Sequence, residues 1–177
     1  QLIDDNFRFV KVPKFKVIDG KKSLNQERGK IPYKLSELKD WITHGNHVGI
    51  WGWYGKLGIV DLDHPNKDTR HAMLIAIVKE CGKTWIVKTC SGKEHLYYYV
   101  DRECHPEMDI DGDSEKGKAW EIRAQRDKLT LVPINNHGLY RTLWDHGIAT
   151  TTIDQILYAL KRWTWDKNCL LYTSDAA

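Results

Sequence analysis

The apolar residues of this chain occur in short runs separated by Gly, Pro, Asn or Asp, and this pattern constrains the fold more than any other feature. The runs 57–63 and 95–100 have strand length and are bounded by turn-forming residues, which predicts β-strands. Another segment repeats at helical spacing, with Leu74, Ile77 and Cys81 on one face. No run reaches the roughly 18 apolar residues of a membrane-spanning helix, so we expect a soluble protein that makes no membrane contact.

The order of the predicted elements indicates an α+β fold. We expect, in chain order, a helix with its N-cap at Ser36, strands 47–51 and 57–63 joined as a hairpin, a helix capped by Asp68, strands 84–89 and 95–100 joined by a tight turn, strands 118–123 and 128–133 as another hairpin, and a helix with a Thr152–Gln155 capping box. This mixture is typical of a mainly antiparallel sheet with helices packed on one face. The acidic segment 109–115 lacks EF-hand spacing and is expected to be a surface turn.

Charge and cysteine content narrow the function only slightly. The 177 residues include 27 Lys and Arg against 24 Asp and Glu, and the net charge of +3 does not by itself indicate nucleic-acid binding. The four Cys residues contain no C-x-x-C pair that would hold zinc. No signal peptide precedes them, so we expect an intracellular, cytoplasmic protein with reduced thiols.

Three acidic residues stand out as candidate metal ligands. In the run 57–63, side chains alternate between the two faces, so Asp61 and Asp63 share the face opposite Val60 and Leu62. If the apolar pair packs under the helices, both carboxylates lie on an open sheet face. Glu121 is the single acidic residue on the polar face of the later strand 118–123. Oxygen ligands from separate strands suit Mg²⁺ or Mn²⁺ in a two-metal site.

The segment between these strands predicts an anion site. Ser91 and Gly92 belong to a small turn that lets backbone N–H groups approach a phosphate, and Lys93 and His95 add positive donors. Beside a metal site, such a turn would bind a triphosphate. A Ser-Gly-Lys turn alone is also typical of an ordinary hairpin connection.

These motifs together resemble the archaeo-eukaryotic primase superfamily, and most closely the bifunctional primase-polymerase (prim-pol) domain of plasmids, phages and mobile elements. The segments that carry the resemblance read GIVDLDHP, TCSGKEHLYYYV and AWEIRAQ, with HVGIWGW and LVPINNHGLYR as flanking segments. Two departures are Lys93, where the family has a second Gly in the turn, and Glu121, where Asp is commoner. The resemblance spans roughly residues 30–145.

The resemblance implies a primase-polymerase core with an RRM-like catalytic sheet that transfers nucleotides by a two-metal mechanism. It implies that Asp61, Asp63 and Glu121 hold Mg²⁺ or Mn²⁺. By the same resemblance, the nucleotide contacts come from a set of polar residues, namely Ser91, Gly92, Lys93, His95, Arg123 and His137. The implied partners are single-stranded DNA template, dNTP or NTP, and a fused or separate helicase, in a prokaryotic or viral replication context.

We expect three parts along the chain. Residues 1–150 would form the catalytic domain, 151–167 a C-terminal helix that begins a linker or a further domain, and 168–177, which follows no pattern in the rest, a tail that is either a linker or non-native. Two other functions stay open from the residues alone. A metal-dependent nuclease is indicated by Glu121 followed two residues later by a basic residue. A non-catalytic single-strand-binding module would use Tyr97 and Tyr99 as stacking platforms, and Trp51, Trp53 or Tyr54 are further candidates for stacking on a base.

Overall fold

The computed structural model describes residues 6–13, 16–18, 21–23, 31–104, 111–114, 117–126, 128–133 and 140–163. The described chain forms an α+β fold with mainly antiparallel sheets and three helices. The strands are β1 (Phe9–Val12), β2 (Lys16–Ile18), β3 (Lys21–Ser23), β4 (His47–Trp51), β5 (Leu57–Leu62), β6 (Trp85–Lys88), β7 (Glu94–Tyr99), β8 (Asp111–Ser114), β9 (Gly117–Arg123), β10 (Leu129–Leu131), β11 (Arg141–Trp144) and β12 (Ala149–Thr150). The helices are α1 (Lys39–Thr43), α2 (Lys67–Cys81) and α3 (Ile153–Leu160), with short 3-10 turns η1 (Leu35–Leu38), η2 (Tyr54–Lys56) and η3 (Lys161–Trp163).

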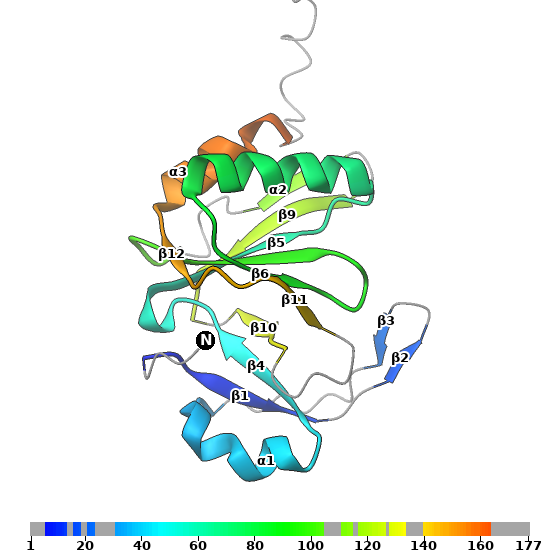
Figure 1. Ribbon diagram of the computed structural model, residues 1–177, viewed down its shortest axis with the longest axis vertical. Coiled ribbons are helices and arrows are strands. Elements are labelled where there is room, and N and C mark those ends of the chain that lie inside the picture. The colour runs from blue at the N-terminus through cyan, green and yellow to red at the C-terminus, as the bar shows by residue number, and fades with distance from the viewer. Residues whose placement is uncertain are drawn as a thin grey trace, which may run out of the picture.

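The larger sheet has seven strands, and β5 lies near its centre. Its strand order is β11-β6-β7-β5-β9-β8, with β12 added in parallel against β7 and all the other pairs antiparallel. Figure 1 shows α2 and α3 lying side by side over one face of this sheet, whereas α1 lies on the opposite side of the molecule, so the prediction of helices on one face holds for two of the three described helices. The prediction of a hairpin between the two strands at 84–89 and 95–100 is also confirmed, because β6 pairs directly with β7.

One hydrophobic core lies between the larger sheet and helices α2 and α3, and it contains the apolar side chains from one face of each central strand. Val60 and Leu62 of β5 pack there with Met73 and Ile77 of α2, and all four side chains are fully buried. Residues of α3, including Ile156, complete the same cluster, so the last helix belongs to this core. The predicted Thr152–Gln155 capping box is confirmed, since the Thr152 side chain accepts from the Gln155 N–H at 3.1 Å.

A second, three-stranded sheet with the order β1-β4-β10 covers the other face, and this layer was not predicted. Figure 1 shows it below the larger sheet, with α1 beyond it. A second core fills the space between the sheets, with Leu57 and Ile59 of β5 packed among Phe9, Ile50 and other buried apolar residues. Both faces of β5 are therefore buried.

The second sheet overturns two predicted hairpins. The segments 47–51 and 57–63 do not pair with each other, because β4 pairs with β1 and β10 while β5 pairs with β7 and β9. Strands 118–123 and 128–133 likewise separate, since β10 joins β4. The chain changes sheet at Gly52, whose N–H donates to the Lys128 carbonyl at 2.8 Å. The η2 turn that follows has positive φ values at Trp53 (69°) and Lys56 (60°), which redirect the backbone into β5.

Three smaller predictions were also wrong. Ser36 lies inside η1, which begins after Lys34. The N-cap of α2 is Asn66, whose side chain accepts from the Thr69 N–H at 3.0 Å, and Asp68 lies in the first turn. In the acidic segment, residues 111–114 form β8 and pair with β9 at the sheet edge, although isolated acidic stretches favour turns. Among the described residues, no helix is long and apolar enough to cross a membrane.

We predict that Gly52→Ala destabilises the fold. A methyl group at this position would lie 2.6 Å from the Arg123 carbonyl oxygen and 2.8 Å from that of Gln125, and neither backbone atom can rotate away. Overpacking of this kind costs about 1–3 kcal/mol. Thermal unfolding followed by circular dichroism measures the loss. The comparison is Gly58→Ala, where the nearest atom, at 2.7 Å, belongs to the Val100 side chain and not to the backbone, so a smaller loss is expected. An unchanged midpoint for Gly52→Ala would contradict this account of the crossover.

Candidate functional site

Three neighbouring strands bring the three predicted motifs together. Asp61 lies on β5, directly opposite His95 on β7 and directly opposite Glu121 on β9. Directly opposed residues of an antiparallel ladder share a face, so the three side chains form one row across the sheet. The backbone of Asp111 on β8 extends the ladder by pairing with Glu121. Three distant parts of the sequence, near residues 61, 95 and 121, therefore meet at this row.

The face that carries this row is largely covered, which corrects the prediction of an open face. Asp61 is 4% exposed and Glu121 is 6% exposed. The alternation was predicted correctly, because Val60 and Leu62 do pack under the helices. However, the same face also carries Leu57 and Ile59, and their burial requires the second sheet as a cover. The acidic residues consequently lie at the margin of an apolar layer.

Asp61 is compensated by two cationic or polar neighbours. Its Oδ1 lies 3.3 Å from His95 Nε2, and its Oδ2 lies 2.6 Å from Arg123 Nη2. Burial alone would raise the pKa of the Asp61 carboxyl, but His95, Arg123 and the more distant Lys93 together hold this pKa well below its ordinary value. Asp61 is therefore an ionised carboxylate at neutral pH despite its burial.

Glu121 is surrounded by basic residues from its own strand and from the next segment. Its Oε2 lies 3.2 Å from Arg123 Nε, and its Oε1 lies 3.0 Å from Lys128 Nζ. Lys118 Nζ approaches Oε2 at a longer 3.7 Å. Arg123 thus bridges Asp61 and Glu121, as expected for two carboxylates that would otherwise repel each other. Lys128 was not predicted as a site residue, since nothing in its sequence neighbourhood marks it.

Asp63 follows β5 and contacts the predicted phosphate turn. Its Oδ1 lies 2.7 Å from Lys93 Nζ, and the side chains are 25% and 33% exposed respectively. The backbone N–H of Asp63 donates to the Ala119 carbonyl, which extends the contact with β9 past the end of the strand. Lys93 thus neutralises one of the candidate metal ligands.

The turn between β6 and β7 is held by its own hydrogen bonds. Thr89 N–H donates to the Lys93 carbonyl at 2.8 Å, and the N–H groups of Gly92 and Lys93 donate to the Thr89 carbonyl and hydroxyl oxygens. Gly92 has a φ of 80°, a left-handed conformation that favours glycine. Because three of the turn's N–H groups bond internally, an anion here would depend mainly on side chains. Those at hand are the exposed Ser91, the half-buried Lys93 and the buried His95.

His95 belongs to a cluster of buried aromatic side chains that carry polar atoms. The His95 ring lies 6.4 Å from the Tyr97 ring and 6.1 Å from the Tyr140 ring. Among the described residues, no hydrogen-bond partner reaches His95 Nδ1 or the Tyr97 hydroxyl. Burial raises the pKa of the Tyr97 phenol well above its ordinary value, so the hydroxyl keeps its proton. Unpartnered buried polar atoms are costly, and their presence beside Asp61 is consistent with a ligand site.

Tyr97 cannot serve as a base-stacking platform. Its side chain is fully buried and packs against Trp85, with the two rings 4.2 Å apart. Tyr99 is half-buried and its ring lies 6.0 Å from that of Phe7. The single-strand-binding alternative therefore loses the exposed aromatic pair on which it depended.

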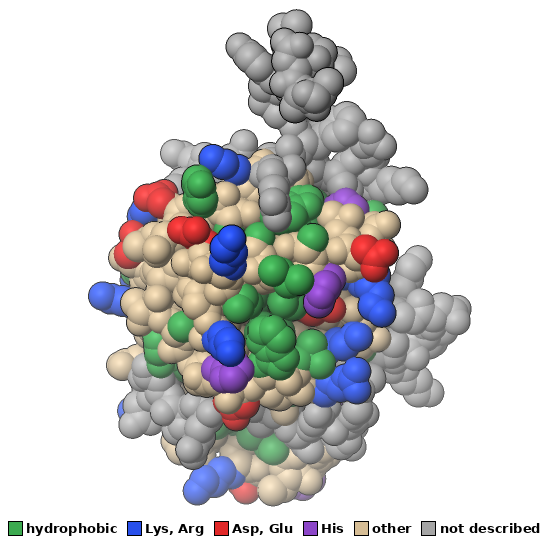
Figure 2. Space-filling model, turned by 45° about the horizontal axis from the view of Figure 1, so that its top comes forward, with side chains coloured by type: hydrophobic (Ala, Val, Ile, Leu, Met, Phe, Trp, Pro, Cys, Tyr) green, Lys and Arg blue, Asp and Glu red, His purple; other side chains and the backbone are tan. Residues whose placement is uncertain are grey.

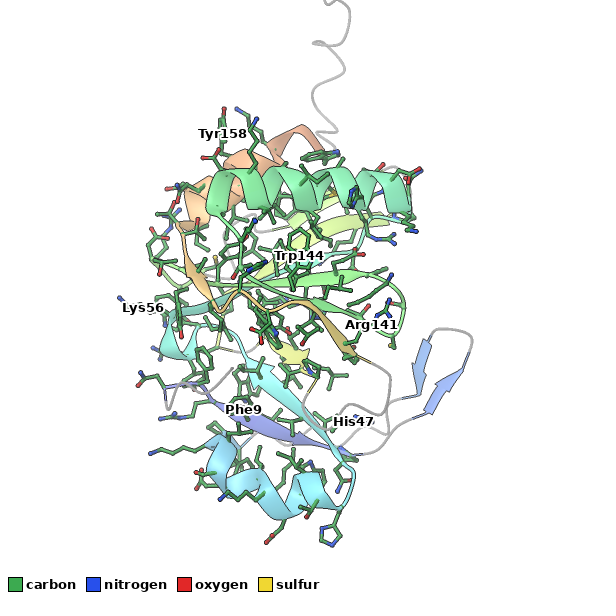
Figure 3. The ribbon with its side chains drawn as sticks, in the orientation of Figure 1. Phe9, His47, Lys56, Arg141, Trp144 and Tyr158 are labelled. Atoms are coloured by element: carbon green, nitrogen blue, oxygen red, sulfur yellow. The ribbon has the colours of Figure 1, made fainter. Side chains whose placement is uncertain are left out.

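The other predicted contacts lie elsewhere. Trp53 and Tyr54 line a hollow with Lys56 and Arg126 at the start of β5, whereas Asp61 lies near the end of this strand. Figure 3 shows Lys56 and Arg141 on opposite sides of the molecule. At the usual rise per residue of a strand, the loop that carries Trp53 and Tyr54 is about 15 Å from Asp61. His137 lies outside the described residues.

The acidic residues carry the oxygen ligands that a divalent cation prefers, but each of them is paired with a basic side chain. Among the residues that the structure describes, no group of three His, Cys, Asp or Glu side chains is close enough to hold one ion. Asp61 and Glu121 are opposed on adjacent strands and offer the hard oxygen ligands that Mg²⁺ or Mn²⁺ prefers. Asp63 is paired with Lys93. The donor set therefore matches such an ion in its chemistry but does not form a three-ligand site as the side chains are placed.

Comparison with known proteins adds no assignment. No protein-family model matches the chain, and no curated protein matches it.

We predict that Asp61 contributes stability that is lost in acid. A carboxyl whose pKa is lower in the folded state stabilises the fold fully above its unfolded value of 3.8, and this contribution declines as the pH falls towards the folded value. Urea unfolding of the wild type and Asp61→Asn between pH 3 and pH 7 should show a smaller acid dependence in the variant. Asp68→Asn, at an exposed helix position, is the control. Parallel curves for the wild type and Asp61→Asn would contradict the role of the buried pairs.

Proposed function

We propose that this domain catalyses template-directed nucleotidyl transfer, as a DNA primase, a DNA polymerase or both. One observation carries the proposal. Three motifs that resemble those of prim-pol domains converge on adjacent strands, with Asp61 only 3.3 Å from His95 and 2.6 Å from Arg123, and Asp63 2.7 Å from Lys93. Nothing in the sequence order alone requires residues near positions 61, 93 and 121 to meet. Their convergence supports a single nucleotide site.

The acidic residues would hold the divalent cations. Asp61 and Glu121 supply opposed oxygen ligands from β5 and β9, and Asp63 supplies a third from the end of β5. When bound, two such ions lower the pKa of an attacking hydroxyl and neutralise the charge of the transferring phosphoryl group. The burial of Asp61 matters here, because charges interact more strongly where water is excluded.

The basic residues would bind and orient the triphosphate. Lys93 and the Ser91 hydroxyl lie on the turn, and His95 presents a buried Nδ1 with no partner among the described residues. Arg123 has a forked guanidinium that already contacts two carboxylates and suits phosphate oxygens equally well. Figure 2 shows Lys and Arg side chains gathered at the right-hand edge of the molecule, the side on which the β6–β7 turn lies in Figure 1. A cationic rim of this kind attracts nucleotides and a single-stranded template.

The two rival functions explain fewer of these contacts. A metal-dependent nuclease would use Glu121 with a nearby lysine, and Lys128 at 3.0 Å now offers one, which the sequence did not indicate. That function still assigns no task to the turn at Ser91 and Lys93. The proposed partners are therefore single-stranded DNA and a dNTP or NTP, in a replication protein of a plasmid, phage or mobile element that works with a fused or separate helicase.

We predict that Asp61→Asn combined with Asp63→Asn abolishes Mn²⁺-dependent nucleotide incorporation. Asparagine keeps the shape and hydrogen-bonding capacity of both side chains but removes the charges that would hold the cations. Alanine would in addition remove the side-chain oxygen that faces the half-buried Arg123 guanidinium at 2.6 Å. The assay combines a single-stranded template, labelled nucleotides and Mn²⁺, with and without a primer, and circular dichroism verifies the fold.

The matched control is Asp101→Asn with Asp154→Asn, because these two acids pair with Arg102 away from the site. Normal synthesis by this control and none by the site variant is the expected result. Undiminished synthesis by the site variant would refute the proposal. Degradation of labelled DNA with Mg²⁺ and no nucleotides would instead identify a nuclease, and EDTA-insensitive DNA binding without synthesis would identify a binding module.

A further inference from the structure

Arg70, in the first turns of α2, is a buried basic residue that joins the two halves of the candidate site. Its Nε lies 3.3 Å from Glu94 Oε2, and its Nη1 donates to the carbonyl oxygens of His64 at 2.6 Å and Pro65 at 3.3 Å. Its Nη2 donates to the Gly92 carbonyl at 3.5 Å. The guanidinium therefore contacts the segment that leaves β5, the β6–β7 turn and the first residue of β7.

These contacts lie immediately behind the chemical groups of the site. His64 follows Asp63, Gly92 precedes Lys93, and Glu94 precedes His95. The ladder between β5 and β7 ends at the pair Leu62 and Glu94, so beyond this pair the two segments have no further strand pairing to hold them. Arg70 bridges them at this point.

A second bridge between the same segments is the Lys93–Asp63 ion pair. Its side chains are 33% and 25% exposed, whereas those of Arg70 and Glu94 are 9% and 14% exposed. A cation at Asp63 or a phosphate at Lys93 would compete with this ion pair, because each would take up charge that the pair now neutralises. Ligand binding therefore weakens the more exposed bridge, while the buried bridge involves no proposed ligand contact.

We infer that Arg70 is a positioning residue that holds the Thr89–Lys93 turn at the carboxylate end of β5 when the Lys93–Asp63 pair is open. The inference deepens the proposed function. Its catalytic consequence rests on that function, whereas the bridging by Arg70 does not. A planar guanidinium can donate to several acceptors in fixed directions, as Arg70 does to three carbonyl groups and a carboxylate. A lysine ammonium at this position has the same charge but lacks the forked geometry.

The test compares Arg70→Lys with Lys93→Met by amide hydrogen exchange on the free protein. The N–H groups of Thr89, Gly92 and Lys93 report on the turn, because each donates within it. Arg70→Lys should raise their exchange rates about tenfold, as expected for losing charge-assisted hydrogen bonds. Lys93→Met should change them by less than about twofold. Amides of the β5–β7 ladder should keep their rates in both variants, which verifies that the fold is intact.

Two further variants complete the comparison. Glu94→Gln keeps Arg70 but removes its buried anionic partner, so it should raise turn exchange without relying on a change at Arg70 itself. Arg102→Lys is the matched control, since Arg102 makes an exposed bidentate pair with Asp154 far along the chain, and its turn exchange should equal that of the wild type. Unchanged turn exchange in Arg70→Lys, or an equal rise in Lys93→Met, would overturn the inference.

The catalytic consequence is measured separately. In nucleotide incorporation, Arg70→Lys should raise the KM for the nucleotide about tenfold and change kcat by less, because a displaced turn weakens nucleotide binding before it affects the acids. A fall in kcat of about tenfold with no change in KM would overturn this role. If the wild type incorporates no nucleotide, the proposed function fails, whereas the exchange results still decide whether Arg70 positions the turn.

Discussion

The buried negative charge of Asp61 is the constraint on which the site depends. An ionised carboxylate between two sheets is tolerated only if cations and hydrogen bonds replace its lost hydration. His95 and Arg123 provide these contacts from the strands on either side. Arg123 in turn contacts Glu121 and donates to the Leu129 carbonyl at 3.1 Å, which connects the larger sheet to β10 of the smaller one. The same ion pairs therefore neutralise the site and help to join the two sheets.

Strand periodicity predicted much of the larger sheet. The alternation in 57–63 placed Val60 and Leu62 on the helix side and Asp61 on the other, because period-two patterns follow directly from strand geometry. The failures were in strand pairing. Both predicted hairpins beside Gly52 and Lys128 were wrong, since proximity in sequence does not reveal that β4 and β10 belong to a different sheet. That choice depends on tertiary contacts such as the close approach of Gly52 to the Arg123 and Gln125 carbonyls.

Strand assignment from the sequence placed Asp61, His95 and Glu121 on separate strands, and the structure shows these strands adjacent with the three residues directly opposed. Charge patterning along one chain does not show which bases face which acids. Lys128 reaches Glu121 from beyond the end of β9, and Arg70 reaches the turn from a helix that carries no motif. Tyr97 illustrates the opposite error, because an aromatic strand can equally be a stacking surface or, as here, a fully buried core element.

The burial of β5 on both faces gives Asp61 and the β6–β7 turn different mobilities. A strand that contributes Leu62 to one core and Ile59 to the other opens only when the whole molecule unfolds, so the position of Asp61 fluctuates little. Ser91, on an exposed connection, is free of that restriction. Substitutions at the turn are therefore expected to leave the placement of Asp61, His95 and Glu121 intact, whereas substitutions on β5 disturb both cores at once.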